Sequence, residues 1–421
     1  MQIMTHGRGL YAWVTSVALA QSGHNVTLVC CTEPDDEVRL EPKLLERAQV
    51  LQAESQMTVV ASLPDALPAV HFLGLASGGV EALHQRAKAI VENTLLDVAL
   101  VVLNTTPVGT LDALQAELEV MAQGRSVTVL ALPLFVRSGR ALADFSEPPL
   151  LLIGEPYAGA ADELLDWLRP YSRQALDTLP VPLAAAELTK FAINAMLATR
   201  ISLMNELAGL AGRMQVDIEL VRQGMAADPR IGPDYLQPGC GFGGPSFTDE
   251  LFKFAESLRE AGGQPGVLDA VLRINAEQRE KPFRQLWRHY EGQLSGRRVA
   301  LWGVAFKPGA ASVEHSPVHA LLSALLAQGV GVVVHDPKAV PALLAQYPEA
   351  AITVAESPLA AAMGADAVLL LTAWPVYHNP DYAALRAAMR QPVIIDGRNV
   401  FEPEMMEQAG FVYYGVGRGR A

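Results

Sequence analysis

Cysteine is nearly absent from this sequence: Cys30, Cys31 and Cys240 are the three cysteines in 421 residues. Three thiols do not make a disulfide framework, so we expect a protein of a reducing compartment such as the cytoplasm. Basic residues are also scarce, because 32 Lys and Arg face 45 Asp and Glu and no basic block occurs. The net charge of −13 argues against nucleic acid or an anionic membrane as the main partner.

Long apolar runs are missing as well, and none is sufficient to span a bilayer. The N-terminus enters a strand-like segment without the charged and apolar regions of a signal peptide. Half of the residues are nevertheless hydrophobic, which is ample for buried cores, and the length predicts two or three domains. We therefore expect an intracellular protein that holds any phosphate ligand with a few placed cations and helix N-termini.

The first third of the chain alternates strand-like and helical segments, which predicts a doubly wound α/β domain. Between the first strand and the first helix, Gly7, Gly9 and Ala12 have the dinucleotide-binding spacing G-x-G-x-x-G/A. The N–H groups that follow Gly7 would hold a pyrophosphate. The predicted strands are 1–5, 25–31, 57–61, 69–75, 96–103, 126–132 and 150–153.

The second strand ends without the acid that normally binds the cofactor ribose in this fingerprint. Cys30 stands there instead, and Glu33, Asp35 and Asp36 follow in the loop and would have to reach back. A lost charge-assisted hydrogen bond costs on the order of 1.5–3 kcal/mol. Such a loss weakens dinucleotide binding considerably without forbidding it.

A glycine-rich stretch, 237–250, carries glycines at 239, 241, 243 and 244. This density fits neither a helix nor a strand, but it lets backbone N–H groups approach a ligand closely. Ser246, Asp249 and Glu250 follow at the start of an amphipathic helical run. At a helix start a hydroxyl either meets a developing anion or is a plain N-cap, and the loop by itself leaves both readings open.

Apolar residues recur at helical spacing over 183–210 without a proline, which predicts one long helix that bridges two domains. Lys190 and Asn194 lie four residues apart in this helix and share a face, where they either bind an oxyanion or form a solvated stripe. A second α/β unit begins near residue 296. Its strand-like runs start at 298 and recur at 330–335, 365–372 and 392–395.

Together these pieces resemble the nucleotide-sugar 6-dehydrogenases, the family of UDP-glucose 6-dehydrogenase and GDP-mannose 6-dehydrogenase. The resemblance runs nearly end to end, and its most specific motifs lie at 187–206, 228–244, 303–308 and 393–399. It implies an α/β fold with two Rossmann-like domains joined by a central helical dimerisation domain. The implied domains are a dinucleotide-binding domain at 1–180, a central helical dimerisation domain at 181–290, and a nucleotide-sugar-binding domain at 291–421.

Such enzymes use two NAD to convert the C6 alcohol of a nucleotide sugar, such as UDP-glucose, to a carboxylate for polysaccharide biosynthesis, through a cysteine thioester and without a metal. The resemblance implies NAD contacts from Gly7, Gly9, Leu10, Ala12 and Thr105. It implies catalytic roles for Thr105, Lys190, Asn194, Ser246 and Glu250. It implies sugar-nucleotide contacts from Tyr235, Gly239, Gly243, Phe306, Lys307 and Arg398, and from Arg230 of the partner in a homodimer.

The departures from the family pattern fall on the chemistry. The family's Gly-Gly-Ser-Cys-Phe-Pro-Lys-Asp is Gly-Gly-Pro-Ser-Phe-Thr-Asp-Glu here, so Ser246 replaces the nucleophilic cysteine and Glu250 replaces the aspartate. A serine hydroxyl ionises far less than a thiol and needs an adjacent base. Leu134 replaces the glutamate used for hydrolysis, and a leucine neither activates water nor accepts a proton. Glu314 stands where an arginine usually touches the cofactor.

Two readings of the function remain open. The first is an NAD-dependent nucleotide-sugar 6-dehydrogenase that is slow or stops at an intermediate, since loss of a general base typically costs about 10²–10⁴ in rate. The second is a binding protein, either a paralogue or a regulatory subunit, that holds a nucleotide sugar without oxidising it. An oxidation that needs no covalent step is also compatible with the sequence.

Overall fold

The computed structural model describes residues 1–30, 33–75, 79–175 and 177–418. The chain forms two compact units, Met1–Ile193 and Asn194–Ala421. Each unit contains a twisted sheet with helices packed on it, so the predicted α/β class is confirmed. The finer division into 1–180, 181–290 and 291–421 stays a prediction.

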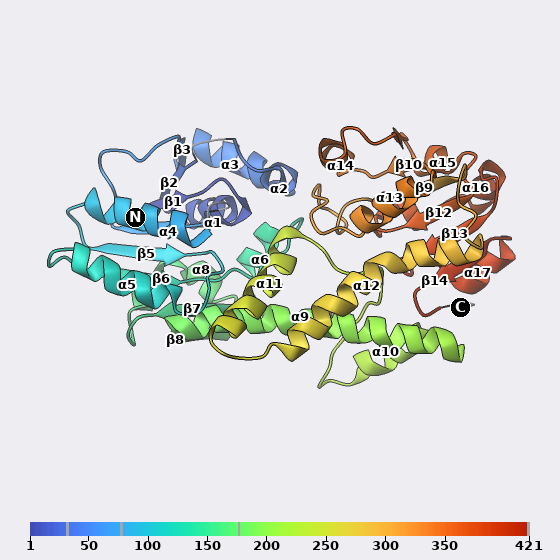
Figure 1. Ribbon diagram of the computed structural model, residues 1–421. Helices are drawn as coiled ribbons and strands as arrows, with labels where there is room; N and C mark the ends of the chain where they lie inside the picture. The colour runs from blue at the N-terminus through green and yellow to red at the C-terminus, as the bar shows by residue number, and fades with distance from the viewer. Residues whose placement is uncertain (31–32, 76–78, 176, 419–421) are drawn as a thin grey trace. The chain divides into compact units, whose positions relative to one another are not determined.

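The first unit is built on one sheet with the strand order β3-β2-β1-β4-β5-β6-β7-β8 (Figure 1). Neighbouring strands are parallel except for β6 and β7. The central strands are almost continuously buried and apolar, as expected for a sheet covered on both faces. The strands are β1 (Gln2–His6), β2 (Asn25–Val29), β3 (Met57–Val60), β4 (Val70–Leu73), β5 (Val98–Val102), β6 (Val127–Ala131), β7 (Leu150–Glu155) and β8 (Asp177–Pro182).

Helices of the first unit bury two separate cores against this sheet, which confirms the doubly wound prediction. One core takes Trp13 from α1, Leu44 from α3 and Phe145 from α6, and the other takes Ile90 from α4 and Leu114 from α5. The helices are α1 (Leu10–Gln21), α2 (Asp36–Leu40), α3 (Leu44–Ala53), α4 (Gly79–Glu92), α5 (Thr110–Met121), α6 (Ala141–Ser146), α7 (Asp162–Trp167) and α8 (Arg169–Ser172).

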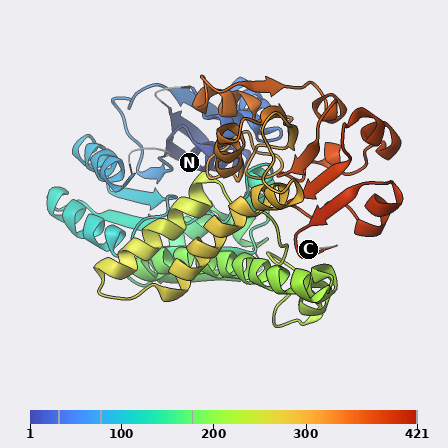
Figure 2. The ribbon, with the colours of Figure 1, turned by 45° about the vertical axis from the view of Figure 1, so that its right-hand side comes forward.

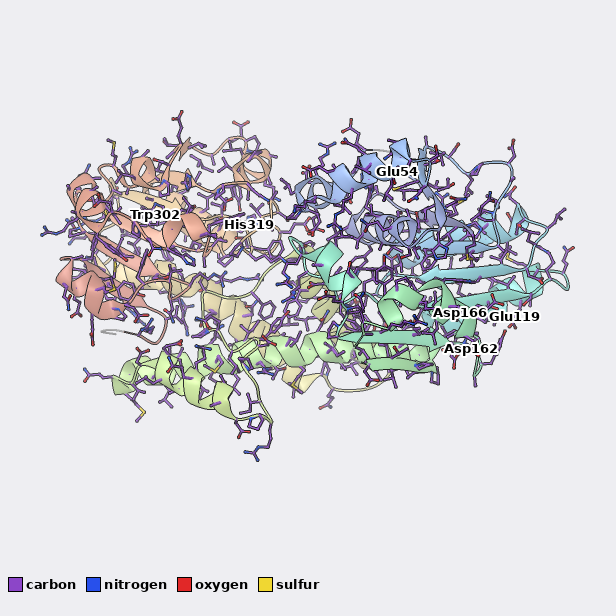
Figure 3. All side chains as sticks on the ribbon, turned by 180° about the vertical axis from the view of Figure 1, so that it is seen from behind. Glu54, Glu119, Asp162, Asp166, Trp302 and His319 are labelled. Atoms are coloured by element: carbon purple, nitrogen blue, oxygen red, sulfur yellow. The ribbon has the colours of Figure 1, made fainter. Side chains whose placement is uncertain are left out.

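Several acidic side chains lie exposed on the surface of this unit. Figure 3 shows Glu54, Glu119, Asp162 and Asp166 pointing away from the ribbon, and all four residues are exposed. Solvated carboxylates of this kind account for the acidic balance of the chain without marking a site.

The second unit holds a parallel sheet in the order β11-β10-β9-β12-β13-β14. Trp302 lies fully buried on β9 and stacks on Tyr377, 5.2 Å between ring centroids. The strands are β9 (Arg298–Trp302), β10 (Gly331–His335), β11 (Ile352–Val354), β12 (Ala367–Leu370), β13 (Val393–Asp396) and β14 (Val412–Gly415). The elements packed around them are α13 (Val318–Ala327), α14 (Val340–Gln346), α15 (Pro358–Ala362), η1 (Pro375–Tyr377), α16 (Tyr382–Ala388) and α17 (Pro403–Gln408).

Both sheets contain the strand order 3-2-1-4-5-6 counted within their own unit, which is the doubly wound order of dinucleotide-binding folds. Three strands, β8, β11 and β14, were not predicted from the sequence. β8 contains Pro180 and Pro182 and is mostly exposed, so it lacks the apolar pattern of a strand. β11 is short and has no buried residue, and β14 is short with one, Tyr413, so neither shows the alternation of a half-buried strand.

The predicted long helix is confirmed as α9 (Leu183–Met214), which runs from the end of the first unit into the second. It ends four residues later than predicted, because Gly209 and Gly212 are tolerated inside it. α10 (Ile218–Ala227), α11 (Pro245–Glu260) and α12 (Gly266–His289) complete the helical part (Figure 2). α11 and α12 pack on α9 around Ala198, Leu251 and Leu268.

Candidate active site

The glycine turn between β1 and α1 is required by close packing. Gly7 has φ +132°, and a Cβ there would lie 2.1 Å from the carbonyl oxygen of Gly74. Gly9 is the N-cap residue of α1, and Leu10 and Ala12 are buried behind it. The amides at the start of α1 therefore lie in a turn that excludes side chains, as a pyrophosphate cradle requires.

The loop after β2 does reach back to this turn. Asp35 Oδ1 lies 3.0 Å from Nε of Arg8, and the Asp35 amide donates to the Arg8 carbonyl at 3.2 Å. Glu33 and Asp36 pair with Arg39 instead. Cys30 is buried at the end of the strand, and Cys31 lies outside the described residues. Asp35, which reaches the glycine turn, is thus already paired with the Arg8 guanidinium, a contact that the sequence did not predict.

Thr105 is half-buried in the loop between β5 and α5. Its neighbour Thr106 donates from Oγ1 to Glu187 Oε1 at 2.8 Å. The Glu187 carboxylate also accepts from the amides of Gly109, at 2.6 Å, and Leu111, at 3.1 Å. Burial raises the pKa of Glu187 to about 7, although these hydrogen bonds oppose the shift. Glu187 on α9 therefore anchors the loop that carries Thr105.

Lys190 is buried in the first unit beside the loop that follows β6. Its Nζ donates to the carbonyl oxygen of Leu134 at 2.8 Å and lies 4.7 Å from the centroid of the Phe135 ring. The Leu134 side chain points the other way, into the apolar core. The position where the family places a carboxylate therefore offers Lys190 only a backbone oxygen.

Asn194 and Glu250 meet in the second unit. Nδ2 of Asn194 donates to Oε2 of Glu250, and both residues are buried. The residues predicted to steady an oxyanion and to replace the family's aspartate thus form one hydrogen-bonded pair between α9 and α11.

Most amides of the glycine loop bond to protein groups. Gly239 donates to Asn205 Oδ1 at 2.8 Å, Phe242 to Asn275 Oδ1 at 2.8 Å, and Gly244 to the Glu314 carbonyl at 2.9 Å. Within the described part of the chain, the Gly243 amide donates to no protein acceptor. A Cβ on Gly243 would also lie 2.4 Å from the His315 carbonyl oxygen, so this glycine is required by packing.

Ser246 is the second residue of α11 and is exposed. The N-cap is Gly244, which makes no side-chain cap, so the reading of Ser246 as a plain N-cap is wrong. Within its own unit, no described residue hydrogen-bonds to the Ser246 hydroxyl. Its position at the positive end of the helix dipole favours an anion, but among the described residues of this unit no base that would ionise the hydroxyl is bonded to it.

An acid–histidine pair begins three residues after Ser246 in α11. Asp249 Oδ1 is 2.7 Å from Nε2 of His315, and the ring centroids of Phe252 and His315 are 6.5 Å apart. His315 has φ +54°, an uncommon conformation for a residue with a side chain. The sequence offered no signal for this pair, because its members are 66 residues apart.

The Arg398 side chain makes two hydrogen bonds to backbone carbonyls and leaves one nitrogen without an acceptor among the described residues. Its Nε donates to the Leu371 carbonyl at 2.6 Å and its Nη1 to the Gly241 carbonyl at 3.0 Å. Nη2 is buried, and no described residue accepts from it. Burying a guanidinium donor without an acceptor is costly, so this atom is suited to an anionic ligand group.

The other predicted sugar-nucleotide residues lie on three different segments of the second unit. Lys307 is half-buried, with Nζ 5.5 Å from the centroid of the Phe306 ring. Tyr235 has φ +58°, and its ring centroid lies 6.4 Å from that of Phe247. Arg230 is exposed on the turn after α10 and pairs with Asp228 at 2.6 Å.

Two family models match this chain. The first, UDP-glucose/GDP-mannose dehydrogenase family, central domain, matches residues 184–277. The second, the UDP binding domain of the same family, matches residues 300–403. The matches cover the long helix, the glycine loop and most of the second sheet.

Whole-chain relatives agree with these models. A UDP-glucose 6-dehydrogenase of Pseudomonas aeruginosa is 36% identical over 100% of this chain and 98% of its own. One from Bacillus subtilis is 30% identical over 99% of this chain and 93% of its own. The solved UDP-glucose dehydrogenase of Pyrobaculum islandicum superposes with a TM-score of 0.87 at 30% identity, covering 99% of this chain and 98% of that one. No helix among the described residues has the length and apolar character needed to span a membrane.

Proposed function

The chain belongs to the UDP-glucose/GDP-mannose dehydrogenase family, and from this premise we propose that it binds UDP-glucose or a similar nucleotide sugar and oxidises it at C6 only slowly. The observation that carries the binding proposal is the buried Nη2 of Arg398, which no described residue engages. Arg398, Lys307 and the open amide of Gly243 would hold the phosphates, with Tyr235 and Phe306 beside them.

NAD fits the first unit in part. The Gly7 turn and the N-terminus of α1 have the shape and dipole for a pyrophosphate. The ribose side lacks an acid at Cys30, and Asp35 is shared with Arg8. NAD, when bound, accepts hydride from the substrate carbon. We propose weak NAD binding through Gly7, Gly9, Leu10, Ala12 and Thr105.

The residues of this chain would act on the sugar as follows. Lys190 and Asn194 steady the oxygen at C6, and Glu250 takes the proton that the hydroxyl loses when the aldehyde forms. Ser246 captures the aldehyde poorly, because its hydroxyl has no bonded base within its unit. Leu134 activates no water, so the second oxidation and the hydrolysis are slow or absent.

A second candidate function is binding alone, as a paralogue or regulatory subunit of an active dehydrogenase. It is favoured by the contact of Lys190 Nζ with the Leu134 carbonyl, because an ammonium held by its own backbone is less available to a substrate oxyanion. Exposed Met196, Leu203 and Leu210, at seven-residue intervals on α9, supply an apolar seam for the homodimer that we propose in either case.

The test combines calorimetry with UDP-glucose and with NAD separately and an assay of NADH formation, beside the Pseudomonas aeruginosa relative. We expect both ligands to bind and NADH to form about 10²–10⁴ times more slowly than in the relative. Equal turnover, with two NADH per sugar, contradicts the impairment. Tight sugar binding with no NADH and no NAD heat supports the binding protein instead. Light scattering of the purified protein tests the dimer.

A further inference from the structure

A cavity of about 340 Å³ lies at the surface of the second unit, and the cations that line it, Arg213, Lys281, Arg284 and Arg288, are exposed to solvent. Its walls are the last turns of α9, one face of α12, and the segments that follow β13 and β14. Its volume is at the lower end of the roughly 300–1,000 Å³ of small-ligand pockets. Ligands of open α/β sheets bind outside the carboxyl ends of the strands, and this cavity lies at that edge of β13 and β14.

Several basic side chains line this cavity, although the net charge of the whole chain is −13. Lys281, Arg284 and Arg288 occupy positions i, i+3 and i+7 of α12 and therefore share one helix face. Arg213 joins them from the last turn of α9. A Cβ on Gly209 would lie 3.8 Å from Lys281 Nζ, so the ammonium reaches across to α9.

Most of these cations have no structural partner. Arg284 pairs with Glu280 at 2.6 Å. Arg213, Lys281 and Arg288 form no ion pair with any residue of the described chain. Partial burial lowers the pKa of Lys281, and the charges of Arg213 and Arg284 lower it further against the opposing effect of Glu277. Like charges on one helix face destabilise the helix, so the fold itself gains nothing from this arrangement.

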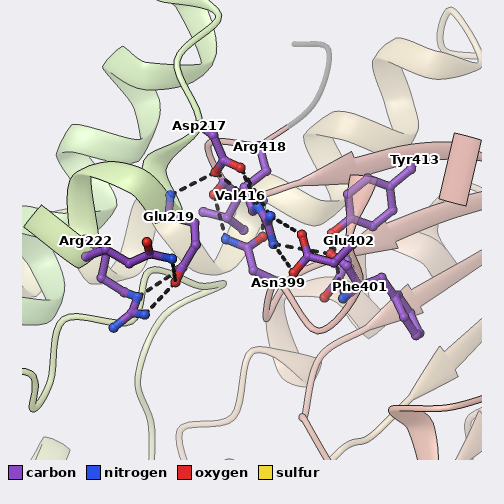
Figure 4. A network of polar contacts seen from close by, with 11 residues as sticks. Asp217, Glu219, Arg222, Asn399, Phe401, Glu402, Tyr413, Val416 and Arg418 are labelled. Atoms are coloured by element: carbon purple, nitrogen blue, oxygen red, sulfur yellow. Dashed lines mark hydrogen bonds and ion pairs between the residues drawn. The ribbon is translucent and has the colours of Figure 1, made fainter. Parts of the chain in front are cut away.

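One further cation of the cavity, Arg418, is structural (Figure 4). It is buried and pairs with Asp217 at 3.1 Å and with Glu402 at 2.6 Å. This network fixes the segment after β14 to the N-cap of α10, where the Ile218 amide also donates to the Gly417 carbonyl. The wall opposite α12 is therefore held in place independently of any ligand.

We propose that this cavity binds a small molecule that carries a diphosphate or triphosphate, with Lys281, Arg288 and Arg213 on the phosphate oxygens. The glycines at 209, 212, 397, 415 and 417 leave the room for it. The site goes beyond the proposed dehydrogenase function, because Ser246, Lys307 and Arg398 do not line this cavity.

The test is calorimetric binding of inorganic tripolyphosphate, and of ATP, to the full chain. We expect saturable binding of tripolyphosphate that weakens with salt. In the double variant Lys281→Gln with Arg288→Gln the affinity should fall at least about tenfold, as expected for lost charge-assisted contacts. Equal affinities for the two probes identify the phosphate chain as the recognised group, and tighter ATP binding identifies a nucleotide.

The matched control is Arg273→Gln, which removes a cation from α12 that pairs with Glu277 and does not line the cavity. It should bind tripolyphosphate as the unaltered chain does, and circular dichroism should show all variants folded. The proposal is overturned if the double variant binds tripolyphosphate as tightly as the unaltered chain does, or if no saturable binding occurs. Loss of UDP-glucose binding alone would refute the proposed function and leave this site standing.

Discussion

Lys190 Nζ donates a 2.8 Å hydrogen bond to the carbonyl oxygen of Leu134, and both residues are buried in the first unit. The contact ties the start of α9 to the loop after β6. The family resemblance predicts a glutamate side chain at position 134, whereas the residue present, Leu134, offers its backbone carbonyl to the ammonium. The contact therefore stabilises this loop at the position where we predict that a catalytic carboxylate is missing.

Replacing Lys190 by Met should destabilise the first unit by about 1–3 kcal/mol, because the side-chain volume is kept while a buried carbonyl loses its donor. Urea unfolding followed by circular dichroism measures the change. The control is Lys253→Met, at an exposed position of α11, where we expect less than about 0.5 kcal/mol. Equal effects of the two substitutions would contradict the role of the Lys190 contact.

Glu187 should make stability fall with rising pH. Its pKa is raised from 4.5 to about 7 in the folded chain, so the folded state holds a proton that the unfolded state releases between these values. The contribution is complete below pH about 4.5 and is lost as the pH rises through about 7, on the order of 3 kcal/mol in total.

Unfolding free energies at pH 5 and pH 8 test this expectation against Glu187→Gln, which cannot titrate. The variant should lack the part of the decrease that is due to Glu187, although it also loses acceptor capacity toward Thr106 and two amides. Glu54→Gln, at an exposed position, serves as the control. A pH dependence unchanged by Glu187→Gln would refute the assignment.

The buried pair His6 and His71 should act in the opposite direction. Nε2 of His6 lies 3.0 Å from Nδ1 of His71, and burial lowers the pKa of both imidazoles, that of His71 to about 4. In the unfolded chain both histidines bind a proton as the pH falls below about 6.5, whereas in the folded chain they stay neutral to lower pH. Stability is therefore full above pH about 6.5 and falls as the pH drops toward 4, by on the order of 3 kcal/mol for His71.

Acid unfolding of His71→Gln should be less steep than that of the unaltered chain over this range. The matched control is His378→Gln, at an exposed position, which should leave the dependence of stability on acid pH unchanged. If both variants unfold with the same acid dependence, the buried pair does not control acid stability.

Restoring the thiol by Ser246→Cys should produce a covalent adduct with UDP-glucose and NAD. A cysteine thiol ionises far more readily than a serine hydroxyl, and the helix dipole at the start of α11 favours the thiolate further. Leu134 still supplies no carboxylate, so the thioester should accumulate rather than hydrolyse. Intact-protein mass spectrometry detects the adduct, and Ser257→Cys on the same helix should show none. Absence of an adduct while both ligands bind would contradict the proposed role of position 246.

Much of the fold was predictable because burial leaves a local pattern. Continuous apolar runs predicted the central strands, and helical spacing without proline predicted α9. The strands that were missed are exposed or short, and β8 carries two prolines, so their pairing depends on neighbours rather than on their own residues. The Gly7 turn was predictable because its spacing reflects a steric requirement.

The candidate site was predictable only at the level of which residue type stands where. The family resemblance predicts that Ser246 and Leu134 stand in place of a thiol and a carboxylate. The sequence did not show that Asp35 would meet Arg8, or that Asp249 would meet His315. Those partners are distant in sequence, and their choice follows from packing.

The sequence by itself thus determined the alternation of strands and helices, the glycine turns and the departures from the family pattern, because each depends on the backbone preference or chemistry of neighbouring residues. Only the tertiary structure decided which charges are neutralised and which are not. Lys281 and Arg213 are 68 residues apart in the sequence, and they line one cavity because α9 and α12 pack together, which no local sequence pattern predicts.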